Sequence, residues 1–370
     1  AQIIIARRNG EGKPKEIGQI IDQSLYFMLP MAILTFLLLR YWSVFILDFA
    51  VKSENIFIET SIYLKYRSFG IFFAMGNMVF RAFYVGLTKT KVITWSTFVM
   101  AAVNIILDYI LIFGKFGAPE LGVAGAAIAS VIAEATALIY FIIYTFVTVK
   151  FSDYNLFKFY KPELARLYSI LKIAIPIMLQ QFLSLSVWFV FFLLIEKIGE
   201  MALAVSNIIR SIYVILMIPI WGFATATNTL VSYVIGLGKE DEVISLVYKI
   251  AGLTLIGVIG IVSIGLLFPN AILSIYTNDP ILIEMGRPAL KIVSVGVIFV
   301  GLGFIFFNGI SGTGRTDVSL SLEVIVLAIY LLYTYILIFI FDANVTLAWS
   351  SEIVYGLLLS IVSIIYLIKG

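Results

Sequence analysis

Long apolar stretches separated by short polar loops are the dominant pattern of this 370-residue chain. Ten stretches are about 20 residues or longer, the length that an α-helix needs to cross a bilayer. They run at about 19–45, 60–85, 92–113, 121–148, 166–195, 201–235, 246–268, 283–310, 317–341 and 347–368. Residues 99–113 are apolar almost all round, whereas a membrane β-strand would alternate apolar and polar residues. The pattern therefore predicts an all-α polytopic membrane protein with about ten transmembrane helices.

The basic residues predict how these helices are oriented. Every second loop is rich in Lys and Arg: residues 7–16, residues 89–91 and residues 150–172. The loops between them carry single basic residues next to acids. Because cytoplasmic loops hold an excess of Lys and Arg, the basic loops are expected to be cytoplasmic. With ten helices, both ends of the chain are then expected on the cytoplasmic side.

Composition narrows the functional classes. The chain is 62% hydrophobic and only 13% charged, with a mean hydropathy of +1.08, so no large soluble domain fits. It contains no Cys and no His, which excludes thiol nucleophiles, disulfides, Ser-His catalysis and metal centres held by those residues. No segment has the spacing of a nucleotide-binding P-loop. We expect neither an enzyme nor a metal or cofactor, and we assign the net charge of +3 to topology rather than to nucleic-acid binding.

The chain aligns with itself when it is shifted by 226 residues. Residues 86–113 and 312–339 share nine identities without a gap, and both end in Tyr-Ile-Leu-Ile-Phe. Two apolar helices can match by composition alone. However, the loop motif Gly-x-Gly-Lys at 10–13 also recurs at 236–239 in the same register. Matches of Gly and Lys in loops are not explained by the apolar composition of the helices. Duplicated halves of this kind are typical of membrane transporters.

The repeat predicts two pseudo-symmetric lobes. We assign residues 1–148 to an N-terminal lobe of about four helices plus a stub, 149–165 to a cytoplasmic linker and 166–370 to a C-terminal lobe of six helices. In this register residue 1 pairs with Asn228, so the first helices of the second half lack counterparts. We therefore expect nearly two helices to be missing from the first half. A natural short form and an incomplete sequence are equally compatible with this expectation.

Asp108 is the leading candidate for a functional side chain. A charged residue at the centre of a membrane helix costs about 2.5–3.5 kcal/mol and usually faces protein or water. Asn104 lies one turn before it, so the two side chains share a helix face and are expected to share a hydrogen-bond network. A proton relay and an Asp that fixes helix packing both remain open. Asp108 aligns with Thr334 in the repeat, so we expect only the first half to place an acid at membrane depth.

Other polar residues within the apolar stretches are candidates to line a substrate cavity. Glu134 lies in a helix that begins with small residues, and it could line a cavity or form an interhelical hydrogen bond. The remaining candidates are neutral: Gln180, Gln181, Ser184, Asn207 and Asn308. For each of these, lining a cavity and joining helices are equally open.

Four segments resemble the multidrug and toxic compound extrusion (MATE) transporters. They are the turn 86–91, the stretch 103–114, the loop 117–129 and the segment 198–204. The resemblance covers essentially the whole chain, and it implies a fold of about twelve helices in two lobes around a central cavity. It also implies export of organic, often cationic, compounds in exchange for H⁺ or Na⁺. By this resemblance we expect a monomer in the inner (plasma) membrane.

The resemblance also implies roles for particular residues. The Asn104–Asp108 pair is similar to the first-lobe acid site of the DinF-like branch, which makes Asp108 the cation-coupling acid and Asn104 its partner. The NorM-like branch has acids in two second-lobe helices, where this chain has Ser184 and an apolar position near Leu302. The DinF-like site has a second Asp on the family's first helix, in the region that this sequence lacks. By this resemblance we expect the coupling network to be incomplete in this chain.

Two alternatives remain open. The wider superfamily includes lipid-linked oligosaccharide flippases, which would need several Arg or Lys in the cavity to hold pyrophosphate, and the sequence shows no such cluster. The chain could also be a truncated fragment that does not transport.

Overall fold

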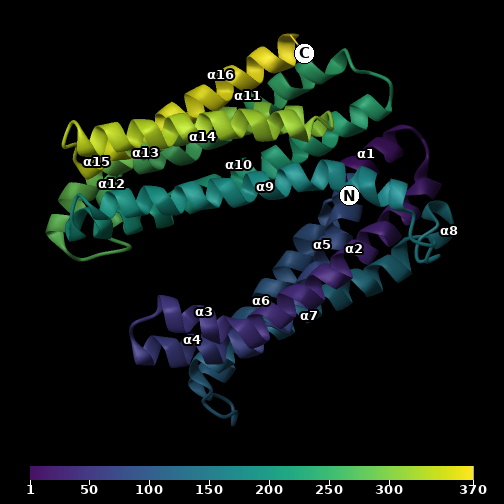
Figure 1. Cartoon of the computed structure of the whole chain (residues 1–370), viewed down its shortest axis with the longest axis horizontal. Helices are drawn as coiled ribbons and strands as arrows, with labels where there is room; N and C mark the ends of the chain where they lie inside the picture. Colours follow the sequence, from purple (N-terminus) through teal and green to yellow (C-terminus); the bar gives the residue numbers. More distant parts are fainter. Residues whose placement is uncertain (370) are drawn as a thin grey trace. The chain divides into compact units, whose positions relative to one another are not determined.

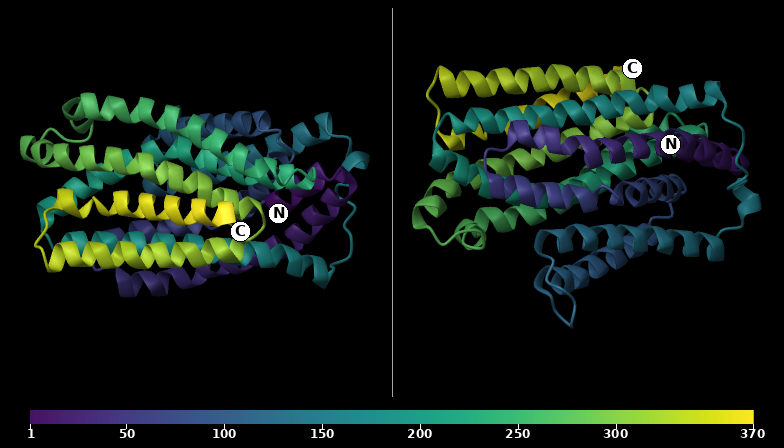
Figure 2. Two further views of the ribbon diagram at one scale, coloured as in Figure 1. Left: turned by 90° about the horizontal axis from the view of Figure 1, so that it is seen from above. Right: turned by 60° about the horizontal axis from the view of Figure 1, so that its bottom comes forward.

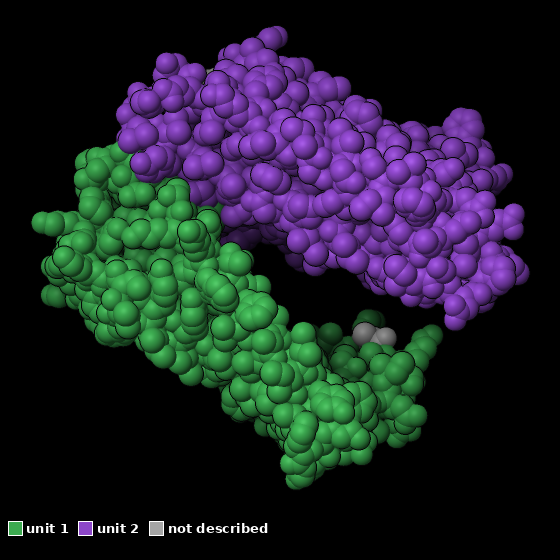
Figure 3. All heavy atoms as spheres, turned by 180° about the vertical axis from the view of Figure 1, so that it is seen from behind, with its two compact units in different colours: residues 1–170 green, residues 171–370 purple. Residues whose placement is uncertain are grey.

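The computed structural model describes residues 1–369, and every regular element in that range is a helix (Figure 1). This confirms the all-α fold class. The chain forms two compact units, which we call unit 1 (Ala1–Ile170) and unit 2 (Leu171–Gly370) (Figure 3). Figure 2 shows the helices of each unit from two further directions.

Unit 1 is built around α7, which packs against α4, α5 and α6, while α1 and α2 pack against α5. Its elements are α1 (Gln2–Gly10), η1 (Pro14–Glu16), α2 (Ile17–Leu37), the π-helical turn η2 (Leu38–Trp42), α3 (Ser43–Ala50), α4 (Glu54–Arg67), α5 (Gly70–Gly86), α6 (Lys91–Phe113), α7 (Gly122–Thr148) and α8 (Phe151–Tyr154). Aromatic side chains fill its core, where the rings of Tyr84 and Phe141 stack with centroids 5.9 Å apart. Burial of these large rings stabilises the contact between α5 and α7.

Unit 2 is built around α13, which packs against α10, α11, α14 and α16. Its elements are α9 (Leu164–Glu196, whose first residues belong to unit 1), α10 (Glu200–Gly236), α11 (Glu242–Leu267), α12 (Pro269–Leu273), α13 (Pro280–Gly312), α14 (Thr316–Phe339), α15 (Val345–Ala348) and α16 (Ser351–Lys369). A Cβ at Gly356 would lie 2.4 Å from the backbone nitrogen of Val300. α16, which holds Gly356, and α13, which holds Val300, therefore touch through their backbones, as small residues allow in membrane bundles.

In the described residues, nine helical segments are long and apolar enough to cross a membrane, and a bent pair makes a tenth. This agrees with the ten predicted helices. The predicted span 60–85 is not one straight helix, because α4 and α5 meet at an angle of 51°. The break follows Arg67, whose guanidinium lies where a Cβ at Gly70 would stand. Sharp helix kinks are common at Gly and Ser residues.

The ends of the helices follow the register of the sequence repeat. The last residues of α1 and α10 are 226 positions apart, as are those of α5 and α13 and those of α6 and α14. The left-handed turns recur as well. Gly12 and Gly238 have φ of 69° and 74°, and Thr88 and Gly314 have φ of 60° and 93°. The second glycine of each Gly-x-Gly-Lys loop thus takes the positive φ that glycine accepts without steric cost.

The segment after α8 is fastened to α2. The backbone nitrogen of Tyr160 donates to Asp22 Oδ2 at 3.1 Å, and that of Glu163 donates to Gln23 Oε1 at 3.1 Å. The Gln23 amide donates in turn to the carbonyl of Lys161 at 3.0 Å. These bonds satisfy buried polar groups of α2 and hold the segment that leads into α9.

Candidate functional site: an acidic pocket in unit 2

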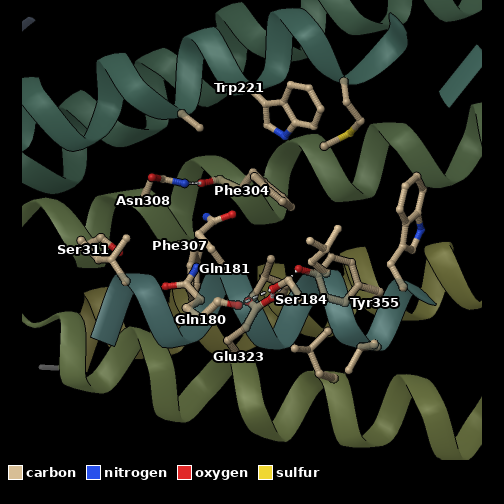
Figure 4. A pocket seen from close by; sticks show the side chains of 18 of the residues that line it. Gln180, Gln181, Ser184, Trp221, Phe304, Phe307, Asn308, Ser311, Glu323 and Tyr355 are labelled. Atoms are coloured by element: carbon tan, nitrogen blue, oxygen red, sulfur yellow. Dashed lines mark hydrogen bonds between the residues drawn. The ribbon is translucent and has the colours of Figure 1, made fainter. Parts of the chain in front are cut away.

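Five helices of unit 2 surround a pocket of about 570 Å³ (Figure 4). The helices are α9, α10, α13, α14 and α16. The lining residues are Ile177, Gln180, Gln181, Ser184, Leu185, Val187, Trp188, Tyr213, Val214, Met217, Trp221, Ala224, Thr225, Asn228, Phe304, Phe307, Asn308, Ser311, Glu323, Leu327, Tyr330, Glu352, Tyr355 and Leu359. Apolar and aromatic side chains with a few polar groups are the usual lining of small-molecule sites.

Four of the six candidates from the sequence line this pocket. They are Gln180, Gln181, Ser184 and Asn308, and Figure 4 shows them around one cavity. The Asn308 amide donates back to the carbonyl of Phe304 at 2.9 Å. Asn207, the remaining candidate in unit 2, is exposed on α10 and is not among the lining residues.

Glu323 of α14 is a pocket residue that the sequence analysis missed. Its side chain is only 2% exposed and lies within the span Thr316–Phe339. Its Oε1 accepts hydrogen bonds from Ser184 of α9 at 3.0 Å and from Tyr355 of α16 at 2.8 Å. One carboxyl oxygen thus joins three helices, and Figure 4 shows these side chains together.

Glu352 of α16 is the second missed acid. It is 3% exposed and lies within the span Val345–Lys369. Tyr213 of α10 donates to its Oε2 at 2.9 Å, and Tyr330 of α14 donates to its Oε1 at 3.1 Å. α14 and α16 are therefore bonded reciprocally, because the glutamate of each helix accepts from a tyrosine of the other.

Neither acid has a basic partner in the part of the chain that the structure describes. No described residue forms an ion pair with Glu323 or Glu352, and none of the described lining residues is Lys or Arg. Burying an ion costs several kcal/mol unless it is paired. Tyrosine and serine hydroxyls supply hydrogen bonds but no positive charge, so a proton or a bound cation must balance each carboxylate.

Sequence reasoning could have found both acids. The rule that singled out Asp108 applies equally to Glu323, six residues inside the predicted span 317–341, and to Glu352, five residues inside 347–368. The expectation that only the first half places an acid at membrane depth is therefore wrong. Neither glutamate stands at the position equivalent to Asp108 in the repeat, which is Thr334.

An unpaired amide oxygen also belongs to this pocket. Asn228 lines it and is 9% exposed, and its Oδ1 accepts no hydrogen bond from the described residues. Buried acceptors are usually paired, so such an atom indicates a position where a ligand or a water donates.

Asp108 and Asn104 lie in unit 1, on α6. The Asp108 Oδ1 atom is buried and has no hydrogen-bond partner among the described residues. The Asn104 amide donates across to Ser130 of α7 at 3.5 Å. The expected network between the two side chains is thus not formed, because Asn104 points its donor to the neighbouring helix. Their role in coupling stays a prediction.

Glu134 forms an ion pair in unit 1. Its two carboxyl oxygens accept from the Arg67 guanidinium at 2.6 and 2.9 Å, and its backbone carbonyl accepts from Asn77 at 2.9 Å. Of the two interpretations left open for Glu134, these contacts favour the interhelical one. The sequence analysis had not named Arg67. Among the described residues, no group of three or more acids, His or Cys is placed to hold a metal ion.

Comparison with known proteins shows which family the sequence belongs to. The sequence matches the profile of the MatE family over residues 1–110 and 176–336. It is 27% identical to "Probable multidrug resistance protein NorM" of Thermotoga maritima, over 85% of this chain and 68% of that protein. It is 26% identical to the protein of the same name from Idiomarina loihiensis, over 79% of this chain and 63% of that one. The chain thus spans about two thirds of the length of these relatives.

The fold is similar to solved transporter structures. A MOP superfamily transporter from Pyrococcus furiosus superposes with a TM-score of 0.91 at 18% identity, over 99% of this chain and 81% of that one. A MATE in complex with MaL6 superposes with a TM-score of 0.90 at 19% identity, over 99% and 82% of the two chains. The profile match covers most of the chain, and the chain therefore belongs to the MatE family of multi-pass membrane transporters.

Proposed function

We propose that the protein is a secondary active exporter of organic compounds, often cationic, in exchange for H⁺ or Na⁺. Family membership and the multidrug-resistance names of two relatives support transport of drug-like molecules. The cell inner (plasma) membrane, cytoplasmic termini and a monomeric state belong to the same proposal. The coupling ion is the only cofactor that it requires.

The acidic pocket of unit 2 is the observation that carries this proposal. Its two glutamates have no basic partner among the described residues, and aromatic rings of Trp188, Trp221 and Tyr213 form part of its wall. A cation gains from both features, since carboxylates attract it and ring faces hold it. A lipid-linked pyrophosphate would instead need Arg or Lys, and no described lining residue is of that kind. The pocket thus supports an organic cation over the flippase alternative.

Asp108 is proposed as the coupling acid of unit 1, with Asn104 in a supporting role. Its buried Oδ1 has no partner among the described residues, so a proton or a cation can occupy that position without displacing an existing bond. A membrane potential supplies about 2.3 kcal/mol per charge per 100 mV, which is enough to drive such an exchange.

The test is transport in proteoliposomes. The 370-residue chain and a version extended at its N-terminus would be reconstituted, and ethidium movement would be followed under an imposed pH gradient or an imposed Na⁺ gradient. The proposal expects ethidium movement driven by one gradient. It also expects loss of that drive in Asp108→Asn, but not in Glu120→Gln, which removes an exposed carboxylate of the same unit.

The outcomes separate the alternatives. Transport by the short chain would refute the fragment interpretation, and transport by the extended chain alone would support it. If neither chain moved ethidium or another organic cation under either gradient, the proposed function would be wrong. If transport occurred and Asp108→Asn kept its full ion dependence, only the coupling role of Asp108 would be lost.

A further inference from the structure

We infer that the pocket of unit 2 selects organic dications, with Glu323 and Glu352 each pairing with one of the two positive groups. This inference rests on the proposed function and specifies its substrate class. Both glutamates line one pocket of about 570 Å³, a volume typical of sites for drug-sized molecules.

The first argument is charge balance. The groups that face the two carboxyls carry no positive charge: Ser184 of α9, Tyr213 of α10, Tyr330 of α14 and Tyr355 of α16. The other lining residues of α9, α10 and α13 are neutral as well. A carboxyl in this environment holds a proton or pairs with a cation, because an unpaired buried charge is costly. When no cation is bound, two protons, one on each acid, therefore balance the charge of the pocket.

The second argument is an acceptor with no donor. Asn228 lines the same pocket from α10, and its Oδ1 receives no hydrogen bond from the described residues. It is independent of the two acids, since it bonds to neither. An N–H group of a ligand would satisfy it. Amidinium and ammonium groups combine such N–H donors with positive charge.

These features treat monocations and dications differently. A monocation displaces the proton from one glutamate and leaves the other protonated. A dication displaces both protons and gains a second charge-assisted contact. A second contact of this strength corresponds to about tenfold or more in affinity. The number of protons released on binding is thus expected to equal the number of positive charges on the ligand.

The experiment uses pentamidine, an aromatic diamidine, and an analogue in which one amidinium is replaced by the neutral carboxamide of the same shape. Binding to the purified full chain in detergent would be measured calorimetrically in buffers of different ionisation enthalpy, which gives both affinity and proton release. Glu323→Gln, Glu352→Gln and the double variant would be compared with Glu240→Gln. Glu240 is an exposed glutamate of unit 2, so its variant controls for loss of one charge.

We expect wild type and Glu240→Gln to bind pentamidine about tenfold or more tightly than the analogue, with two protons released against one. Each single pocket variant is expected to bind the two ligands almost equally and to release one proton fewer with pentamidine. Thermal unfolding of each variant checks that it is folded. A variant that fails this check is replaced by Glu→Ala at the same position, which removes the charge as well.

Equal affinities of wild type for the two probes would overturn the dication inference and leave the proposed function standing. Unchanged discrimination in both single variants would also overturn it, because the selectivity would then arise elsewhere. If wild type bound neither probe nor ethidium, and moved no organic cation in the transport assay, the proposed function would fail together with this inference.

Discussion

The hydroxyl of Tyr355 on α16 lies 2.8 Å from Oε1 of Glu323 on α14. The mirror contact runs from Tyr330 on α14 to Glu352 on α16 at 3.1 Å. The rings of the two tyrosines meet edge to face with centroids 5.9 Å apart. The two helices are thus joined by two hydrogen bonds and one ring contact at the acidic pocket. Each of these two glutamates thus lines the pocket and also accepts a hydrogen bond from the neighbouring helix.

Tyr355→Phe is expected to lower the stability of the protein. The change removes a buried donor while keeping the ring, and a lost bond to a buried acid costs about 1–3 kcal/mol. Tyr330→Phe should have a similar effect because it removes the mirror bond. The measurement is the midpoint of thermal unfolding in detergent. Tyr335→Phe serves as the control, since Tyr335 is 50% exposed. Equal midpoints for the control and for both pocket variants would show that these bonds contribute nothing.

Gly356→Ala is expected to push α13 and α16 apart. The added Cβ would stand 2.4 Å from the Val300 nitrogen and 2.6 Å from the Phe299 carbonyl carbon, and backbone atoms of a helix cannot move aside alone. Overpacking of this kind costs about 1–3 kcal/mol. Gly252→Ala on α11 is the matched control, because a Cβ there meets no atom within 4 Å. We expect it to be neutral or slightly stabilising, since Ala favours helix.

One outcome of the unfolding measurement would contradict the expected effect of Gly356→Ala. If Gly356→Ala and Gly252→Ala unfolded at the same temperature, the close approach of α13 and α16 would be wrong. Drug binding gives a second measurement, because α13 and α16 both line the acidic pocket. Gly356→Ala should weaken the binding of pentamidine, whereas Gly252→Ala should leave it unchanged.

Arg67 and Glu134 are expected to stabilise unit 1 as a pair. Their side chains are 28% and 17% exposed, and the contact fixes the end of α4 against α7. A double-mutant cycle with Arg67→Met and Glu134→Gln should give a coupling energy of about 1–3 kcal/mol, within the range for residues in direct contact. A coupling energy near zero would mean that the pair does not hold the bent span.

An exposed pair gives the comparison for this cycle. Lys239, in the loop before α11, lies 2.8 Å from Glu242, the first residue of α11, and the hydrogen bond and charge of Glu242 raise the pKa of Lys239. Solvent screens such pairs, and exposed ion pairs contribute little. The corresponding cycle on Lys239 and Glu242 should therefore give a much smaller coupling energy than the cycle on Arg67 and Glu134.

The helices could be predicted from the sequence because hydrophobic length alone determines a span. The predicted stretch 121–148 is α7 to within a residue, and 201–235 is α10 to within one residue at each end. The bend after Arg67 could not be predicted in this way. It lies beside the ion pair of Arg67 with Glu134, which is 67 residues later in the chain, and hydrophobic length carries no information on such a contact.

The pocket could be predicted only in part. Gln180, Gln181 and Ser184 were visible as a polar patch in one apolar stretch, and all three line the pocket. Their neighbours Glu323 and Glu352 come from two other helices. Periodicity gives the face of each helix but not which faces meet, so the bond from Ser184 to Glu323 has no signal in the sequence.

Thr88→Gly is expected to stabilise the turn between α5 and α6. Thr88 has φ of 60°, where an L-residue with a branched Cβ is strained, and its equivalent in the repeat is Gly314 with φ of 93°. Relief of the left-handed strain contributes about 1–2 kcal/mol, and the greater freedom of glycine in the unfolded chain offsets part of it. A net gain of about 1 kcal/mol should raise the unfolding midpoint.

The reverse change, Gly314→Thr, should lower the unfolding midpoint by a similar amount, because it introduces the same strain into the turn between α13 and α14. Opposite shifts of the two variants would support a shared turn geometry in both halves. A destabilised Thr88→Gly would contradict it and would indicate that the threonine hydroxyl, which donates to the Leu87 carbonyl at 2.7 Å, outweighs the strain.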